Sequence, residues 1–320
     1  MRKLHLRKTR NTSSKKLDLV MLGVIIAVAA GLRLWATGQT SSTKGGLMST
    51  LPFALLGVGS VYLIYIIGRQ WFNRKAGMLS AAFFAVSQFT VFHSQATWPY
   101  SVGLFFVLLT AWFWHKIVFE LREPKAATYI GFALSAWAAS SVQYFSLAQA
   151  VLIFATGLFF LPKSRRKPFW LSGLGILALL ASTLPFTYLY LLGNGSIGAQ
   201  PSAPNVTFFT DFLQYTMNDA SLFMFTVGIV VLLPLILGKR NRSRNPLRWV
   251  GIAWFGIILV FAFIYSMLCK PVLDYNMLVF SYPFLIMTAF SLFRNRTLSP
   301  WQNALVVAAL LFAGLSSLIL

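Results

Sequence analysis

The chain has 320 residues, of which 58% are hydrophobic and only 10% are charged, and its mean hydropathy is +0.72. This composition excludes an ordinary soluble globular protein. The formal charge of +21 at pH 7 suggests an anionic partner, but its distribution does not indicate nucleic acid.

The basic residues gather in alternate connections between apolar stretches. Of the 27 Lys and Arg residues, 24 lie in the segments 2–16, 69–75, 116–125, 163–167, 239–248 and 294–296. The other set of connections holds only Arg33, Lys44 and Lys270, together with the carboxylates Asp211, Asp219 and Asp274. This is the positive-inside pattern of membrane proteins, and it predicts a cytoplasmic N-terminus. Binding of anionic lipid headgroups is a second explanation of the basic charge.

The apolar stretches have the lengths of membrane spans, since about 20 apolar residues cross ~30 Å of hydrocarbon. We predict an all-α, polytopic helical membrane bundle with a basic cytoplasmic tail at 1–17 and a transmembrane domain at 18–320. The apolar core that follows the tail also resembles a signal peptide, but it continues to Trp35, which favours an uncleaved anchor. The eleven predicted spans are 18–36, 47–68, 77–93, 101–118, 126–142, 145–161, 169–193, 221–238, 249–268, 275–293 and 303–320.

An odd number of spans places the C-terminus on the outer side, within the last apolar run. We therefore expect the chain to be either a fragment or a protein without a terminal outer domain.

The longest outer connection, 194–220, ends in an amphipathic segment. A helix there has Phe209, Phe212, Leu213, Thr216 and Met217 on one face and Asp211, Gln214 and Asn218 on the other. Such a helix rests on the membrane interface. We expect either a connector or a lid over a lipid site.

Three segments of the first half carry a pattern that hydropathy does not require. The first span ends Gly31-Leu-Arg33-Leu-Trp35. The second span and the loop after it run from Leu51-Pro-Phe-Ala-Leu-Leu-Gly57 to Gly68-Arg69, Phe72, Arg74 and Ala76-Gly77. The third segment is Ser94-Gln95-Ala96-Thr97-Trp98-Pro99-Tyr100, and Asp274-Tyr275 with Pro283 is a weaker match near the end of the chain.

These segments resemble the GT-C glycosyltransferases, which include protein O-mannosyltransferases and the lipid A aminoarabinose transferase. The resemblance covers about two thirds of the chain. It implies a membrane fold and a polyprenyl-phosphate lipid or lipid-linked sugar as partner. No metal or cofactor is expected, because no cluster of His, Cys, Asp or Glu has metal-ligand spacing.

The chain departs from the family where the chemistry lies. The family keeps an acidic catalytic base in its first outer loop, but the segment from Ala36 to Gly46 has no Asp or Glu. Ala96 stands at the family's Glu, Trp98 at its Arg, and Asp274 at a late Arg. Sugar transfer needs a carboxylate base and a cation at the departing phosphate. We therefore expect weak or absent activity.

The residues that still match the family lie at the outer ends of their spans. We predict an outward-facing substrate cavity with the 205–220 segment beside it, lined by Arg33, His93, Gln95, Tyr100 and Tyr275. Arg33 either snorkels to the interface or binds a lipid phosphate or a carboxylate partner, and His93 is either an interfacial or a substrate-site residue. A relocated catalytic base must be one of the outer carboxylates Asp211, Asp219 and Asp274, and Asp274 is the best candidate. Each of them also fits a solvated residue of a loop or helix end.

Three functions follow from this pattern. The first is a catalytically degenerate GT-C-type protein that binds a polyprenyl lipid or serves as a membrane partner subunit. The second is an active transferase that uses Asp274. The third is a lipid flippase or transporter, which the position of the ionisable residues at span ends disfavours.

Overall fold

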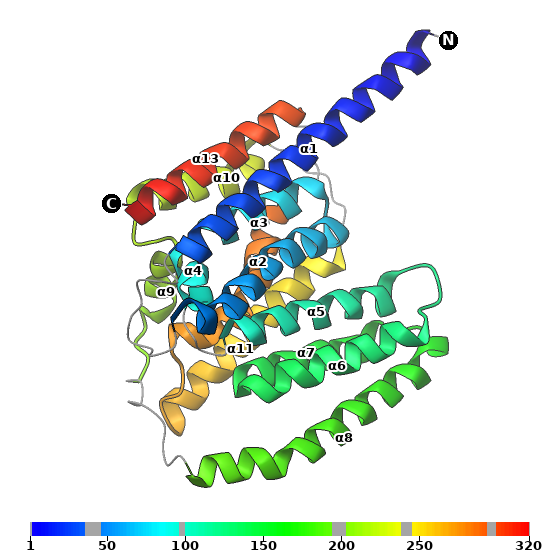
Figure 1. The fold of residues 1–320 in the computed structure, drawn as a ribbon, viewed down its shortest axis with the longest axis vertical. Coiled ribbons are helices and arrows are strands. Elements are labelled where there is room, and N and C mark those ends of the chain that lie inside the picture. The colour runs from blue at the N-terminus through cyan, green and yellow to red at the C-terminus, as the bar shows by residue number, and fades with distance from the viewer. Residues whose placement is uncertain are drawn as a thin grey trace. The chain divides into compact units, whose positions relative to one another are not determined.

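The computed structural model describes residues 2–35, 46–95, 100–193, 203–237, 245–292 and 299–319. These residues form helices joined by short connections and contain no strand (Figure 1). The predicted all-α class is confirmed. The physical reason is that the core of a bilayer offers no water to backbone groups, so helices must satisfy them internally.

The helices follow the predicted spans closely. In chain order they are α1 (Arg2–Trp35), α2 (Gly46–Trp71), α3 (Arg74–Val86), α4 (Gln88–Gln95), α5 (Tyr100–Phe119), α6 (Ala126–Val142), α7 (Tyr144–Phe160), α8 (Lys163–Gly193), α9 (Phe208–Thr216), α10 (Ser221–Leu237), α11 (Pro246–Leu268), the 3-10 helix η2 (Tyr275–Phe280), α12 (Tyr282–Phe290) and α13 (Pro300–Ile319). The predicted tail 1–17 lies largely within α1, which begins at Arg2.

Two predicted spans are broken rather than continuous. The third consists of α3 and α4, which bend by 61° at Ser87, and the tenth starts as η2 before it becomes α12. Among the described residues, five helices are long and apolar enough to cross a membrane, or up to seven if each bent pair counts as one span. The total of eleven spans therefore stays a prediction.

The chain divides into two compact units. Unit 1 comprises residues 1–97, 210–247 and 286–320, and unit 2 comprises 98–209 and 248–285. Each unit has its own core, and each is described separately.

Unit 1 is held together by close helix contacts at glycines. A Cβ on Gly77 of α3 would lie 2.6 Å from the carbonyl oxygen of Tyr65 and 2.8 Å from the backbone nitrogen of Arg69 in α2. A Cβ on Gly68 would lie 2.9 Å from the Cα of Gly77. The two glycines of the Gly-Arg…Ala-Gly pattern therefore let the backbones of α2 and α3 touch, as small residues do between membrane helices.

The N-terminal helix packs on unit 1 with a single face. Its buried residues recur every four positions at Met21, Ile25, Ala29 and Arg33, which is the stripe expected for one helix face. At the start of this stripe, the buried Asp18 carboxylate lies 2.7 Å from the guanidinium of Arg74 at the beginning of α3.

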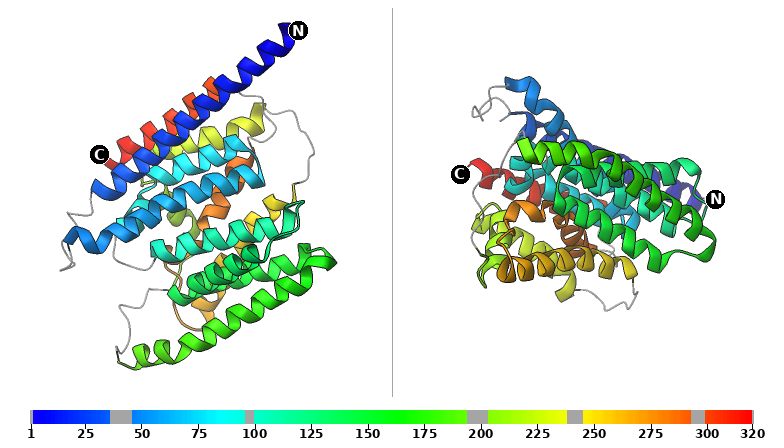
Figure 2. Two further views of the ribbon diagram at one scale, coloured as in Figure 1. Left: turned by 45° about the vertical axis from the view of Figure 1, so that its right-hand side comes forward. Right: turned by 90° about the horizontal axis from the view of Figure 1, so that it is seen from below.

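Unit 2 contains α5, α6, α7 and α8, which run side by side in the views of Figures 1 and 2. Aromatic rings fill the space between them. The rings of Phe154 and Phe169 stack 4.7 Å apart, and those of Trp114 and Trp254 meet edge to face at 4.9 Å. Because Gly157 carries no side chain, the Phe169 ring occupies the space where a Cβ would stand.

Candidate functional site

The structure distributes the predicted site residues over the two units. Arg33, His93 and Gln95 belong to unit 1, whereas Tyr100 and the pair Asp274–Tyr275 belong to unit 2. Within each unit the predicted residues lie close together.

Arg33 is buried, with 1% of its surface exposed, and it binds the backbone of the broken span. Its Nη1 donates to the carbonyl oxygens of Ala85 (3.1 Å) and Ala29 (3.3 Å). Its Nη2 donates to the carbonyl of Phe84 (3.0 Å) and to the hydroxyl of Thr90 (3.3 Å). Of the two alternatives for Arg33, snorkelling is contradicted, because its side chain is buried inside unit 1. Its binding of a lipid phosphate stays a prediction.

These hydrogen bonds follow from the break at Ser87. The last carbonyls of α3 have no partner within their own helix, and in lipid each unsatisfied group is costly. Arg33 satisfies two of them, and its five N–H donors suit this task better than the single ammonium of a lysine.

Asn218 forms hydrogen bonds with the backbone on both sides of the break at Ser87. Its amide nitrogen donates to the carbonyl of Val86 (3.2 Å) and to the Ser317 hydroxyl (2.7 Å), and its amide oxygen accepts the N–H of Gln88 (2.6 Å). The predicted helix at 205–220 is confirmed by α9, but the placement of Asn218 on its polar face is wrong. The residue lies beyond the end of α9 with φ of 64°, a conformation that asparagine tolerates, and its side chain is buried.

His93 and Gln95 lie in the second half of α4, the helix that follows the break at Ser87. The ring of His93 is buried and meets the rings of Phe89 (4.9 Å) and Phe92 (5.8 Å) edge to face. The Gln95 amide nitrogen donates to the carbonyl of Leu32 at 2.7 Å and so ties α4 to the end of α1.

Gly57 makes room for this group. A Cβ on Gly57 would lie 2.4 Å from the Cβ of Ser94 and 3.1 Å from Nε of Arg33. Gly57 ends the Leu-Pro-Phe…Gly segment that resembles the GT-C family. In this structure the segment therefore brings α2 into contact with α4 and Arg33.

In unit 2, Tyr100 is one of several polar side chains that lie near one another, which are called the polar group below. Its phenol is hydrogen-bonded to the side chain of Gln143 and interacts electrostatically with Asp274 and Tyr144, and its ring lies 6.1 Å from that of Phe280. Gln143 separates α6 from α7 in an extended conformation. The polar group therefore combines residues of α5, of the α6–α7 junction and of η2.

Asp274 is the N-cap of η2. One carboxylate oxygen accepts the N–H of Tyr275 at 2.7 Å, and the other accepts the side-chain amide of Asn276 at 2.6 Å. Capping a helix start explains both bonds. Tyr275 is half-buried, and its ring lies 4.9 Å from that of Phe208.

An apolar groove begins at the same polar group. It has a volume of about 270 Å³ and is lined by Tyr144, Phe145, Ala148, Ile258, Phe261, Ala262, Tyr265 and Val272 of unit 2. Tyr144 belongs to both the groove and the polar group, so an apolar surface and several polar side chains adjoin each other.

The other two outer carboxylates, Asp211 and Asp219, lie in or just after α9. Asp211 lies in the first turn of α9 and is partly exposed, whereas Asp219 is exposed in a turn with φ of 49°. The loop 36–45 and the positions Ala96 and Trp98 lie outside the described residues. Within the described part of the chain, no three His, Cys, Asp or Glu residues gather in a way that could hold a metal ion.

Sequence reasoning missed Asn218, Thr90 and Gln143 as members of these groups. Each is an uncharged polar residue whose partners lie far away along the chain or at a helix break. The polar residues between Ser140 and Ser146 separate the predicted spans 126–142 and 145–161, but nothing in them indicates a contact with Tyr100.

Comparisons with known proteins agree with this fold. Residues 42–190 match the family described as dolichyl-phosphate-mannose-protein mannosyltransferase. Among solved structures, ArnT from Cupriavidus metallidurans in the apo state aligns with a TM-score of 0.55 and 13% sequence identity. That match covers 96% of this chain and 63% of the ArnT chain, so the chain spans less than two thirds of the length of that protein. A search of curated proteins finds no match. The family match and the structural match agree with each other, and the chain shares the helical membrane fold of ArnT.

Proposed function

We propose that this protein binds a polyprenyl-phosphate-type lipid in the membrane and transfers sugar weakly or not at all. The family match to dolichyl-phosphate-mannose-dependent enzymes supports a lipid-linked partner. The lipid carries a long apolar chain and an anionic head, so its site must present both kinds of surface.

The observation that carries the proposal is the adjoining groove and polar group of unit 2. The groove offers an almost entirely apolar lining, which suits an isoprenoid chain because it needs no hydrogen bonds. Near Tyr144, the side chains of Tyr100 and Gln143 carry hydroxyl and amide groups that can donate hydrogen bonds to phosphate oxygens.

Weak transfer follows from the missing carboxylates. A positioned base typically contributes about 10²–10⁴-fold to such a reaction. The segment 36–46 and position 96 hold no acidic residue, so the groups with which the family performs this step are absent. A role as a membrane partner subunit is compatible with lipid binding without turnover.

An active transferase that uses Asp274 is the second candidate. It is favoured by one observation, namely that Asp274 interacts with Tyr100 and lies next to Tyr275. Against it, both carboxylate oxygens already accept hydrogen bonds within η2.

For the orientation, we propose a cytoplasmic N-terminus in a plasma membrane, in a bacterium the inner membrane. The uneven distribution of Lys and Arg supports it. Cysteine labelling at Ser164 and Ser202 tests it, and labelling of both from one side would contradict it.

Lipid binding is tested with undecaprenyl phosphate and the purified protein by native mass spectrometry. Ala148→Phe fills the groove, whereas Val151→Phe adds the same ring bulk on an exposed part of α7 outside the groove. We expect Ala148→Phe to weaken binding at least tenfold and Val151→Phe to leave it unchanged. Equal affinity in both variants would contradict a site in the groove.

Transfer is tested with radiolabelled polyprenyl-phosphate sugars and membrane acceptors. We expect no more than a trace of product. Robust transfer that disappears in Asp274→Asn but persists in the matched variant Asp219→Asn would replace the proposal by the active-enzyme alternative.

A further inference from the structure

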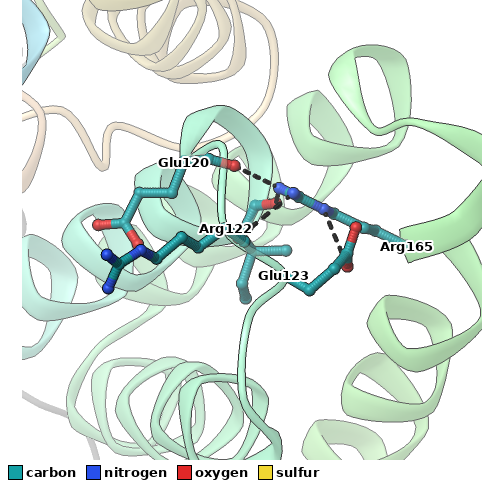
Figure 3. A network of polar contacts seen from close by, with 5 residues as sticks. Glu120, Arg122, Glu123 and Arg165 are labelled. Atoms are coloured by element: carbon teal, nitrogen blue, oxygen red, sulfur yellow. Dashed lines mark hydrogen bonds and ion pairs between the residues drawn. The ribbon is translucent and has the colours of Figure 1, made fainter.

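One end of unit 2, formed by the α5–α6 connection and the start of α8, is organised around the buried Arg165 (Figure 3). Its Nη1 donates to the carbonyls of Ile117 and Glu120, both at 2.9 Å, and its Nη2 donates to the carbonyl of Arg122 at 3.3 Å. Its Nε lies 3.4 Å from the carboxylate of Glu123.

These contacts have a clear physical cause. The carbonyl of Ile117 belongs to the last turn of α5, and those of Glu120 and Arg122 belong to the connection after it. An arginine fork suits such carbonyls and complements the negative end of the helix dipole. The connection after α5 therefore wraps around Arg165, with its carbonyl oxygens facing inward. This fixes the connection against the first turn of α8.

Several positively charged side chains lie on the surface at this end of unit 2. Those that are exposed are Arg122, Lys125, Lys163, Arg166 and Lys167. The ammonium of Lys116, on α5, lies 3.7 Å above the Trp112 ring. The two carboxylates at this end are Glu120 and Glu123, and Glu123 is held by Arg165. Since the first turn of α8 contains no acidic residue, its positive helix end adds to the charge.

Large apolar side chains flank the cations. Leu121 is fully exposed, Phe159 is 84% exposed and Trp170 is 54% exposed. Exposed apolar residues next to Lys, Arg and Trp are typical of the level at which lipid chains meet headgroups. An acidic protein segment would complement the charge but would leave these apolar residues in water.

We propose that this end of unit 2 binds the phosphate headgroups of anionic phospholipids. Here, the cations contact phosphates while Leu121, Phe159 and Trp170 lie among the upper parts of the chains. Basic residues next to a membrane surface each contribute about a fivefold gain in affinity for anionic lipid. The site lies apart from the groove at Tyr144, and it does not depend on the proposed binding of a polyprenyl phosphate.

The test titrates the purified full-length protein with phosphatidylglycerol or phosphatidylcholine and measures bound lipid by native mass spectrometry. We expect tighter binding of phosphatidylglycerol, and this preference should shrink in 1 M salt, where screening acts within ~3 Å. Lys167→Gln should weaken phosphatidylglycerol binding about fivefold, and Lys163→Gln added to it should weaken binding further. Lys167→Arg, which keeps the charge, should restore it.

Lys270→Gln is the matched control, because it removes an exposed lysine from another connection of unit 2. It should leave binding unchanged, and an unchanged melting temperature of each variant shows that the fold is intact. Equal binding of both lipids, or equal loss in Lys167→Gln and Lys270→Gln, would overturn the proposal. Full competition by millimolar inorganic phosphate would assign the surface to a free anion, and binding of poly-glutamate without a lipid preference would assign it to an acidic partner. Either of these outcomes also overturns it.

Discussion

The contact between α2 and α3 leads to the sharpest stability prediction. Gly77→Ala places a Cβ 2.6 Å from the carbonyl oxygen of Tyr65 and 2.8 Å from the backbone nitrogen of Arg69, whereas ordinary contact begins at 3.4 Å. Both obstacles are backbone atoms of a helix, so no side chain can rotate away. The two helices must therefore separate by about 0.8 Å.

The magnitude follows from this displacement. A radial gap of about 0.5–1 Å removes about a quarter to a half of the dispersion energy of each contact, and an overpacked core typically loses about 1–3 kcal/mol. Because α2 and α3 pack along much of their length, we expect the upper half of that range, about 2–3 kcal/mol.

The assay is unfolding of the purified protein in detergent, followed by intrinsic fluorescence. The matched control is Gly256→Ala in α11, where nothing lies within 4 Å of the added Cβ. Alanine is the better helix former by about 1 kcal/mol, so this control should be neutral or slightly stabilising. If Gly77→Ala is as stable as Gly256→Ala, then the backbones of α2 and α3 do not touch and the reasoning fails.

Two further predictions concern the helix ends closed by side chains. Asn218→Ala should lower the free energy of unfolding in detergent by about 3 kcal/mol, because it leaves the Val86 carbonyl and the Gln88 N–H unsatisfied and forces φ of 64° on alanine. Asn218→Gly should recover only the backbone part, and full recovery would show that the hydrogen bonds contribute nothing. Arg165→Lys keeps the charge but loses the fork to three carbonyls, so we expect a loss of about 1–3 kcal/mol and faster amide exchange at residues 117–123. Unchanged exchange there would contradict its role as the cap of α5.

The fold class was accessible from the sequence because a bilayer imposes a simple rule. Apolar stretches of sufficient length become helices, and every predicted span coincides with a helix or a pair of helices, although α1 and α8 begin before their predicted spans. The amphipathic pattern of 209–218 likewise predicted a helix, which α9 (Phe208–Thr216) confirms. The glycines at 57, 68 and 77 belong to segments that resemble a family pattern. Only the folded structure shows that they allow close contacts between helices.

The tertiary structure alone decided what the polar residues do. One alternative for Arg33 was snorkelling to the interface, because it stands near a span end. Instead, its buried side chain binds carbonyls of α3 just before the break at Ser87. No sequence pattern predicted the break, because 86–88 contains neither proline nor glycine. The contacts of Asn218 with Gln88 and of Tyr100 with Gln143 join residues that are far apart along the chain. Hydropathy and spacing report on one helix at a time, so contacts between distant helices, and the polar groups that depend on them, appear only in the folded structure.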